Sequence, residues 1–159
     1  RVALVAGRYG INADFDSWSG YAAARERLLD AIGNAGHGRV IVYGGDSHNA
    51  WAGALRNAAS HVVATEFDVQ SVSSPGFERE HSWSPPDLEA AAWLATNEDL
   101  VWVNTHRRGF MYVRLNATAQ HLEYHGVNTT VGSPSASECL AAFAVAHGSP
   151  GASRTPCLP

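Results

Sequence analysis

A short apolar run that ends in two glycines restricts the fold of this chain more than any other feature. The run Val40–Tyr43 is followed by Gly44-Gly45 and then by Asp46 and His48. Short, β-branched apolar runs are typical of strands in a sheet that is covered on both faces. Glycines after such a strand permit a sharp turn, and the rigid strand end fixes the side chains that follow it. The segment therefore predicts a buried strand that carries two polar side chains into a loop.

The carboxylate and the imidazole of this loop form a candidate metal site. In an extended segment, residues i and i+2 point to the same side, so Asp46 and His48 can face one ion or two adjacent ions. A carboxylate oxygen suits a hard cation such as calcium, and an imidazole suits zinc or iron. The same residues also fit a plain turn with a capping aspartate and a solvated histidine. The pattern alone leaves both interpretations open.

The elements around this strand predict an α/β fold. Residues 1–7 form an apolar run that is expected to be a strand, and residues 19–36 show the periodicity of a helix. The order strand, helix, strand is typical of an α/β domain. We expect the helix to have Ser19 as its N-cap, to end at Gly33 or Gly36, and to bury a stripe made of Tyr21, Ala24, Leu28 and Ile32.

The rest of the chain predicts further helices and strands. Ser84-Pro85-Pro86-Asp87 is a typical helix start, with a capping serine and proline in the first turn. After residue 127 the composition becomes small and polar, so we expect a domain over 1–127 and a tail over 128–159 packed on it. The helix after Ser84 is expected to bury Leu88, Ala91, Ala92 and Ala95. The other expected elements are a helix start within 49–56, a strand at 61–67, a turn at 73–76, and strands at 100–103, 110–115 and 121–126.

Composition excludes some classes of protein and favours one compartment. The chain has 159 residues, a formal net charge of −4 and 11 lysines plus arginines, which provide no basic surface for nucleic acid. No apolar run approaches the roughly 20 residues of a membrane-spanning helix. Cys139 and Cys157 flank the tail, so we expect a disulfide and a secreted or extracytoplasmic protein, with two free thiols as the alternative. Asn116 and Asn128 match the glycosylation pattern, which matters only in a source that glycosylates.

The first residue leads us to expect a piece of a longer polypeptide. The sequence begins with Arg1 inside an apolar run, and its only methionine is Met111. Domains seldom begin in the middle of a sheet, so we expect a C-terminal fragment of a larger precursor. A cut at an arbitrary position is the alternative.

Five short motifs follow one another along the chain. They are Asp16-Ser17-Trp18-Ser19-Gly20-Tyr21 with the helix Arg25-Glu26-Arg27-Leu28-Leu29, then Gly45-Asp46-Ser47-His48-Asn49-Ala50-Trp51-Ala52, Thr65-Glu66-Phe67, Ser71-Val72-Ser73-Ser74-Pro75-Gly76, and Arg107-Arg108-Gly109-Phe110. Their order resembles the second half of the alkaline phosphatase D family of metallophosphoesterases, which includes secreted phosphodiesterases of the phospholipase D type. Ser19 departs from the family pattern, which usually has a second aspartate there, and so do Phe110, often a tyrosine, and residues 68–70, usually more apolar.

The resemblance implies a fold, a metal set and a partner. It implies the C-terminal half of an αββα sandwich, with mixed sheets flanked by helices. Asp46 and His48 would be the last two ligands of a site with ferric iron and calcium, although zinc or another divalent metal also suits these donors, and His48 would be catalytic. Such ions need about four or more donors. The missing ligands would come from an N-terminal chain of the same precursor, and the isolated fragment would bind metal weakly.

The implied reaction is the hydrolysis of a phosphate ester, with metal ions that polarise the phosphoryl oxygens. Monoesters and diesters both fit, as do phospholipids and nucleotides. Candidate substrate contacts are Asn49, Arg107, Arg108 and Trp18, with Tyr21 and Trp51 as further walls of the pocket. Helix capping by Asn49, salt bridges of the arginines and core packing of Tyr21 are the alternatives.

Two other functions can be compared with this one. A non-enzymatic α/β binding module would use the loop for a structural metal or for none. A Ser-His-Asp hydrolase is poorly supported, because no Gly-x-Ser-x-Gly motif occurs and Ser47 lies directly between Asp46 and His48. The remaining histidines, including His121 and His125, read as surface or packing residues.

Overall fold

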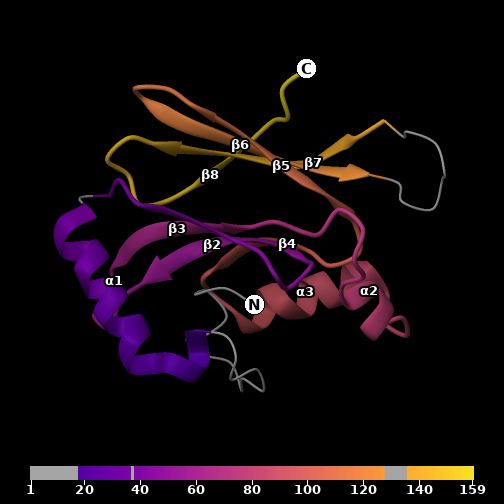
Figure 1. Ribbon diagram of the computed structural model, residues 1–159, viewed down its shortest axis with the longest axis horizontal. Helices are drawn as coiled ribbons and strands as arrows, with labels where there is room; N and C mark the ends of the chain where they lie inside the picture. The colour runs from indigo at the N-terminus through magenta and orange to yellow at the C-terminus, as the bar shows by residue number, and fades with distance from the viewer. Residues whose placement is uncertain (1–17, 37, 128–135) are drawn as a thin grey trace.

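Two sheets pack face to face, and helices cover the outer face of the first sheet (Figure 1). The computed structural model describes residues 18–36, 38–127 and 136–159. The strand expected at 1–7 and the glycosylation candidate Asn128 lie outside these residues. The elements are η2 (Trp18–Tyr21), α1 (Ala22–Gly36), β1 (Ile41–Gly44), β2 (Ala50–Arg56), β3 (Val62–Asp68), α2 (Phe77–Glu80), α3 (Pro86–Thr96), β4 (Leu100–Asn104), β5 (Arg108–Leu115), β6 (Ala119–Val127), β7 (Glu138–Ala146) and β8 (Ser153–Thr155).

The first sheet is mixed, with the strand order β1-β3-β2-β4. Strand β1 runs parallel to β3, whereas β2 is antiparallel to both β3 and β4. Leu29 of α1 and Trp93 of α3 pack against one core on the helical side of this sheet, together with Trp51 and Leu55 of β2. The expectation that β1 is buried on both faces is wrong, because β1 is an edge strand and its Tyr43 is 45% exposed. Pairing with β3 and packing of Val42 against this core hold β1, and therefore hold the start of the loop that follows it.

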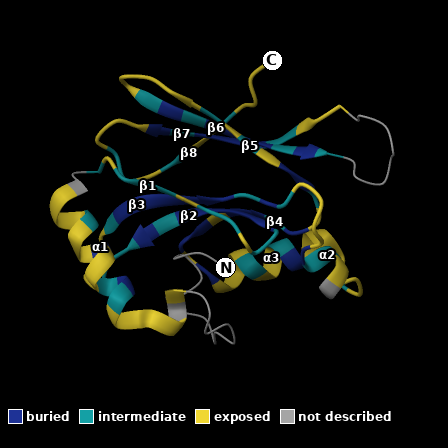
Figure 2. Cartoon of the chain, viewed as in Figure 1, coloured by how far each residue is buried: buried dark blue, intermediate teal, exposed yellow. Residues whose placement is uncertain are grey.

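The second sheet is antiparallel, with the order β5-β6-β7-β8. Its inner face buries Leu122, Tyr124 and Phe143 against Phe67 and Trp102 of the first sheet. Figure 2 shows the buried residues concentrated in the strands of the two sheets, while α1 is largely exposed on its outer side. The expected α/β fold, with mixed sheets flanked by helices, is confirmed.

The prediction that a helix starts within residues 49–56 is wrong, because Ala50–Arg56 is the strand β2. This strand lies between β3 and β4, and both of its edges are hydrogen-bonded. Its alanines favour a helix when taken alone, but pairing on both edges and burial against two cores override that local preference.

The expected buried face is wrong for α3 and wrong in part for the helix at 19–36. Ile32 of the expected stripe packs against the core. Tyr21, which lies in η2, is 59% exposed and Leu28 is 36% exposed, whereas Arg25 and Leu29 are buried. Arg25 can be buried because its guanidinium pairs with Glu26 at 2.9 Å, a charge contact that hydrophobic periodicity does not reveal. Tyr21 is therefore not a core residue.

In α3, polar contacts again decide which face is buried. Leu88 is 65% exposed and the expected alanine face, Ala91, Ala92 and Ala95, is exposed, whereas Glu89 is buried. Glu89 accepts a hydrogen bond from the Thr105 hydroxyl at 3.1 Å and contacts Nδ1 of His81 at 2.5 Å. The helix starts where expected, but its N-cap is Pro85, without a side-chain capping bond.

The segment expected to be a tail packed on the domain contributes two strands, β7 and β8. Residues 138–146 form β7 between β6 and β8, so they are part of the second sheet. The alanine-rich strand reads as small and polar in sequence but packs Phe143 and Val145 into the core between the sheets. The expected disulfide is confirmed and joins Cys139 of β7 to Cys157, with Cα atoms 6.2 Å apart. The division at residue 127 stays a prediction.

Candidate metal centre

The loop after β1 has an unusual backbone. Asp46 has φ 70° and His48 has φ 59°, and both values lie in the left-handed region that residues other than glycine rarely adopt. The loop is therefore not extended, and the expectation that residues i and i+2 share one side does not apply here. Strained backbone of this kind clusters at functional sites, where the surrounding structure holds it. Asp46 is exposed and His48 is half-buried, so both side chains are accessible from solvent.

The imidazole of His48 is oriented by a backbone carbonyl. Its Nδ1 lies 2.7 Å from the carbonyl oxygen of Pro75. A carbonyl oxygen only accepts hydrogen bonds, so Nδ1 carries the proton, and in the neutral imidazole Nε2 then has the free lone pair. This is the arrangement in which a histidine binds metal, with one ring nitrogen held by a backbone acceptor and the other directed to the ion.

Gly76 allows the turn at 73–76 to approach the loop closely. A Cβ at this position would lie 2.6 Å from Oδ1 of Asn49 and 2.7 Å from the carbonyl oxygen of His48. Real Cβ atoms do not come so near to oxygen, so any larger residue would push the turn away from the loop. The glycine therefore permits the contact between Pro75 and His48. Pro75 and Gly76 are not among the site residues expected from the sequence, although the Ser-Pro-Gly turn was a signal for them.

Asn49 joins the loop to the next helix from a buried position. Its side chain is 0% exposed, its Oδ1 accepts the Phe77 N–H at 3.1 Å, and its Nδ2 donates to the Ser47 carbonyl at 2.6 Å. No helix follows the loop directly, so the expected alternative of a cap on such a helix is wrong. Asn49 instead binds the first residue of α2. Its contact with a substrate stays a prediction.

Arg107 and Arg108 both form ion pairs. Arg108 is 8% exposed, and its guanidinium pairs with Glu78, with one N–H 3.0 Å from the carboxylate. The Glu78 carboxylate also accepts the Gly76 N–H at 3.0 Å, so Arg108 supports the turn that holds His48. Arg107 pairs with Glu138 at 2.5 Å, and its side chain is 34% exposed. Arg107 is therefore the more accessible of the two for a phosphate group.

The two tryptophans expected to line the pocket, Trp18 and Trp51, differ in their exposure to solvent. Trp51 is 2% exposed and donates its indole N–H to the Ser47 hydroxyl at 2.9 Å, so Trp51 is a core residue and not a pocket wall. Trp18 lies in η2 and is 39% exposed, and its contact with a substrate stays a prediction.

The sequence and the fold of the chain are similar to those of known proteins. The sequence pattern of the PhoD-like phosphatase family matches residues 3–124. Over 65 residues the chain is 37% identical to alkaline phosphatase D of Bacillus subtilis (strain 168), covering 38% of this chain and 11% of that protein. The fold is similar to a solved structure of PhoD, with a TM-score of 0.76 and 20% identity, over 99% of this chain and 31% of that one. The chain thus spans less than two thirds of the length of either relative.

Proposed function

The chain belongs to the PhoD-like phosphatase family, and from this premise we propose that it is part of a metal-dependent phosphoric ester hydrolase. The observation that carries the proposal is the loop after β1, which holds both the Asp46 carboxylate and the oriented imidazole of His48. A hydrolase of this kind needs oxygen and nitrogen donors on a rigid support, and this loop offers both at the end of β1, a partly buried strand that pairs with β3.

The donors fit the metals that the family resemblance implies. The Asp46 carboxylate suits calcium, and Nε2 of His48 suits ferric iron, with zinc or another divalent metal also compatible. Metals at such a site would polarise the phosphoryl oxygens and assist in-line displacement at phosphorus. His48 is held by Pro75, and Arg108 supports the same turn through Glu78, so the chain fixes the direction of the imidazole before a ligand arrives.

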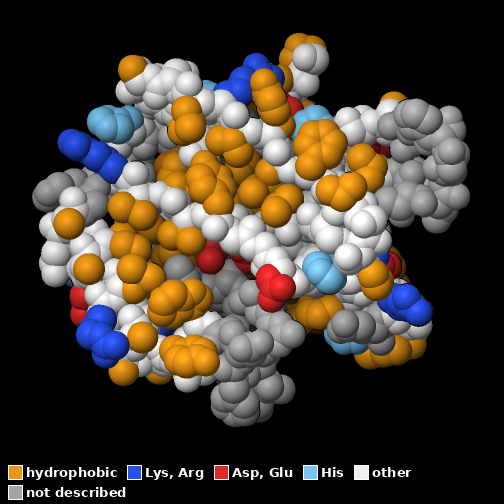
Figure 3. Space-filling view, viewed as in Figure 1, with side chains coloured by type: hydrophobic (Ala, Val, Ile, Leu, Met, Phe, Trp, Pro, Cys, Tyr) orange, Lys and Arg blue, Asp and Glu red, His pale blue; other side chains and the backbone are white. Residues whose placement is uncertain are grey.

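Two donors do not complete such a site, so we propose that other ligands come from an N-terminal chain of the same precursor. Uncovered apolar surface supports this proposal. Figure 3 shows hydrophobic side chains gathered over α1 and over the second sheet. The exposed ones include Tyr21 and Leu28 near α1, Tyr112 and Leu115 on β5, and Trp83, which is 80% exposed. Large exposed apolar patches are typical of surfaces that another chain or segment covers.

The proposed substrate is a phosphomonoester or a phosphodiester, with phospholipids and nucleotides both compatible. Arg107 is the proposed phosphate contact, because it is partly exposed, and Trp18 is a proposed wall of the pocket. The disulfide supports a secreted or extracytoplasmic location. Among the described helices, none is long and apolar enough to cross a membrane.

The test compares His48→Ala with His61→Ala in the polypeptide that contains this chain and the rest of a PhoD-type fold. His61 directly precedes β3 and is exposed, so it is the matched histidine control. We expect His48→Ala to lower the hydrolysis of an aryl phosphodiester and of an aryl phosphomonoester at least about 100-fold. Elemental analysis should show a lower metal content in the same variant. Turnover close to that of the control variant would reject the proposal and favour a binding module.

A further inference from the structure

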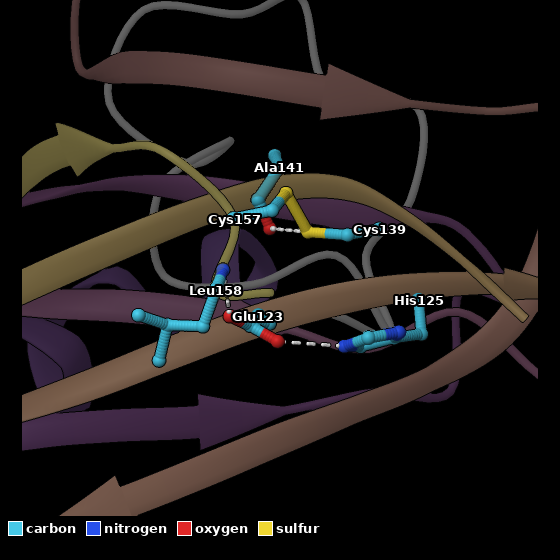
Figure 4. Close-up of a disulfide and its surroundings, with 6 residues drawn as sticks. All are labelled: Glu123, His125, Cys139, Ala141, Cys157 and Leu158. Atoms are coloured by element: carbon cyan, nitrogen blue, oxygen red, sulfur yellow. Dashed lines mark hydrogen bonds and ion pairs between the residues drawn. A yellow bond between two sulfur atoms is a disulfide. The ribbon is translucent and has the colours of Figure 1, made fainter.

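A second group of potential metal ligands lies on the outer face of the β5–β8 sheet. Leu122 and Tyr124 of β6 point into the core between the sheets. Glu123 and His125 alternate with them and therefore face the other way. Cys139 of β7 pairs with His125 in the sheet register. The ligand atoms of Glu123, His125 and Cys139 all lie within 4.8 Å of one another (Figure 4).

The carboxylate and the imidazole of this group are already ordered. Oε2 of Glu123 lies 2.9 Å from Nε2 of His125, and Oε1 accepts the Leu158 N–H at 2.8 Å. The ring of Phe110 stacks on the imidazole, with centroids 5.1 Å apart and an interplanar angle of 5°. Nδ1 of His125 is buried and has no hydrogen-bond partner among the described residues. A metal site that formed here would find two of its ligands held in place.

The disulfide is what blocks metal binding in the oxidised protein. Cys139 is bonded to Cys157, and a thiolate, not a disulfide sulfur, is the ligand that zinc prefers. Two sulfurs bound to one tetrahedral zinc lie about 3.8 Å apart, so each sulfur would need to move by only about 1 Å from the disulfide. Cys157 lies after β8, outside the strands, and is exposed, which leaves it room for such a shift.

We propose that reduction of the Cys139–Cys157 disulfide converts this group into a zinc site with Cys139, Cys157, His125 and Glu123 as its four ligands. In the reduction, two molecules of a thiol reductant are oxidised to their disulfide, and each protein sulfur receives one electron and one proton. Zinc binding then releases both thiol protons. The same two residues thus cross-link β7 to the C-terminal segment in either state, by a covalent bond when oxidised and through the metal when reduced.

Cobalt provides a selective probe for this site. The chain has two cysteines, so a cobalt–thiolate charge-transfer band reports on Cys139 and Cys157 and not on the Asp46–His48 loop. The disulfide is reduced with a phosphine, which leaves as its oxide with oxygen from water, and the protein is desalted without air and titrated with Co²⁺. We expect the band to saturate at one cobalt per chain, to disappear on addition of Zn²⁺, and to be absent without prior reduction.

Variants assign the remaining ligands. His125→Ala and Glu123→Gln should each weaken cobalt binding by about 10-fold or more, whereas His121→Ala, on the same strand and the same face, should leave it unchanged. The proposal is overturned if the reduced chain gives no thiolate band, whether circular dichroism finds it folded or unfolded. It is also overturned if His125→Ala and Glu123→Gln bind cobalt as the parent does, because the cysteines alone would then account for the band.

Discussion

Nδ1 of His48 and the carbonyl oxygen of Pro75 lie 2.7 Å apart, across 27 residues of sequence. This bond joins the loop after β1 to the Ser-Pro-Gly turn before α2. Because the carbonyl fixes the tautomer, the bond decides which ring nitrogen is available to a ligand. The two motifs are therefore one structural unit, in which the turn orients the imidazole.

Replacing Gly76 should separate these two segments. In Gly76→Ala the new methyl group would meet Oδ1 of Asn49 and the His48 carbonyl, and we expect a loss of about 1–3 kcal/mol in the free energy of unfolding. Gly151→Ala is the matched control, because nothing lies within 4 Å of a Cβ there. Urea denaturation of both variants measures the difference. Equal stability of the two would mean that the turn moves aside without cost.

Asn49 should stabilise the loop through both ends of its amide. Asn49→Ala removes the acceptor for the Phe77 N–H and the donor to the Ser47 carbonyl, so we expect a loss of about 2–3 kcal/mol in stability. Asn49→Asp keeps the acceptor and loses the donor, and its stability should lie closer to that of the alanine variant than to the parent. Asn34→Ala, on the exposed side of α1, is the control and should change stability by about 0.5 kcal/mol or less.

Arg107, directly before β5, and Arg108, the first residue of β5, should differ in their contribution to stability. Arg108→Met would leave Glu78 without its buried partner, and we expect a loss of about 2 kcal/mol, less than for a fully buried pair because Glu78 is 27% exposed. Arg107→Met removes a contact to the more exposed Glu138 and should cost at most about 1 kcal/mol. A double-mutant cycle of Arg108 with Glu78 gives the coupling energy directly. A coupling energy near zero would contradict the supporting role of Arg108.

Elements with strong local signals could be predicted from the sequence. The strands at Val62–Asp68 and Leu100–Asn104 are apolar and β-branched, and the helix Ala22–Gly36 is bounded by glycine. Strands β2 and β7 could not be predicted in this way, because their alanines carry no strand preference. Both are strands because they pair with neighbours on both edges, which is a property of the whole sheet.

The candidate site was predictable only in part, for a similar reason. Asp46 and His48 are two positions apart in sequence and follow a recognisable strand, so the local pattern was enough to find them. The support from Pro75, Gly76 and Arg108 depends on contacts between segments far apart in the chain. Burial of charged residues such as Arg25 and Glu89 misled the prediction of helix faces, because apolar periodicity ignores paired charges.

Glu123 should make stability depend on pH in the acidic range. The Leu158 N–H, followed by the contact with His125, lowers the pKa of the Glu123 carboxyl below its usual value of 4.5, although burial acts in the opposite direction. The unfolded chain therefore takes up this proton at a higher pH than the folded chain. The ionised carboxylate stabilises the fold fully above pH 4.5, and this contribution is lost as the pH falls through the lowered pKa.

Glu123→Gln removes this titration and should lose less stability than the parent between about pH 6 and pH 3, measured by urea denaturation with the disulfide intact. The matched control is Glu98→Gln, which removes one exposed glutamate and so accounts for the change in net charge. A parent and a Glu123→Gln variant with parallel curves would mean that the bond from Leu158 does not hold the carboxylate in solution. Since this bond joins Leu158 to β6, the same result would also indicate that it does not hold residues 156–159 against that strand.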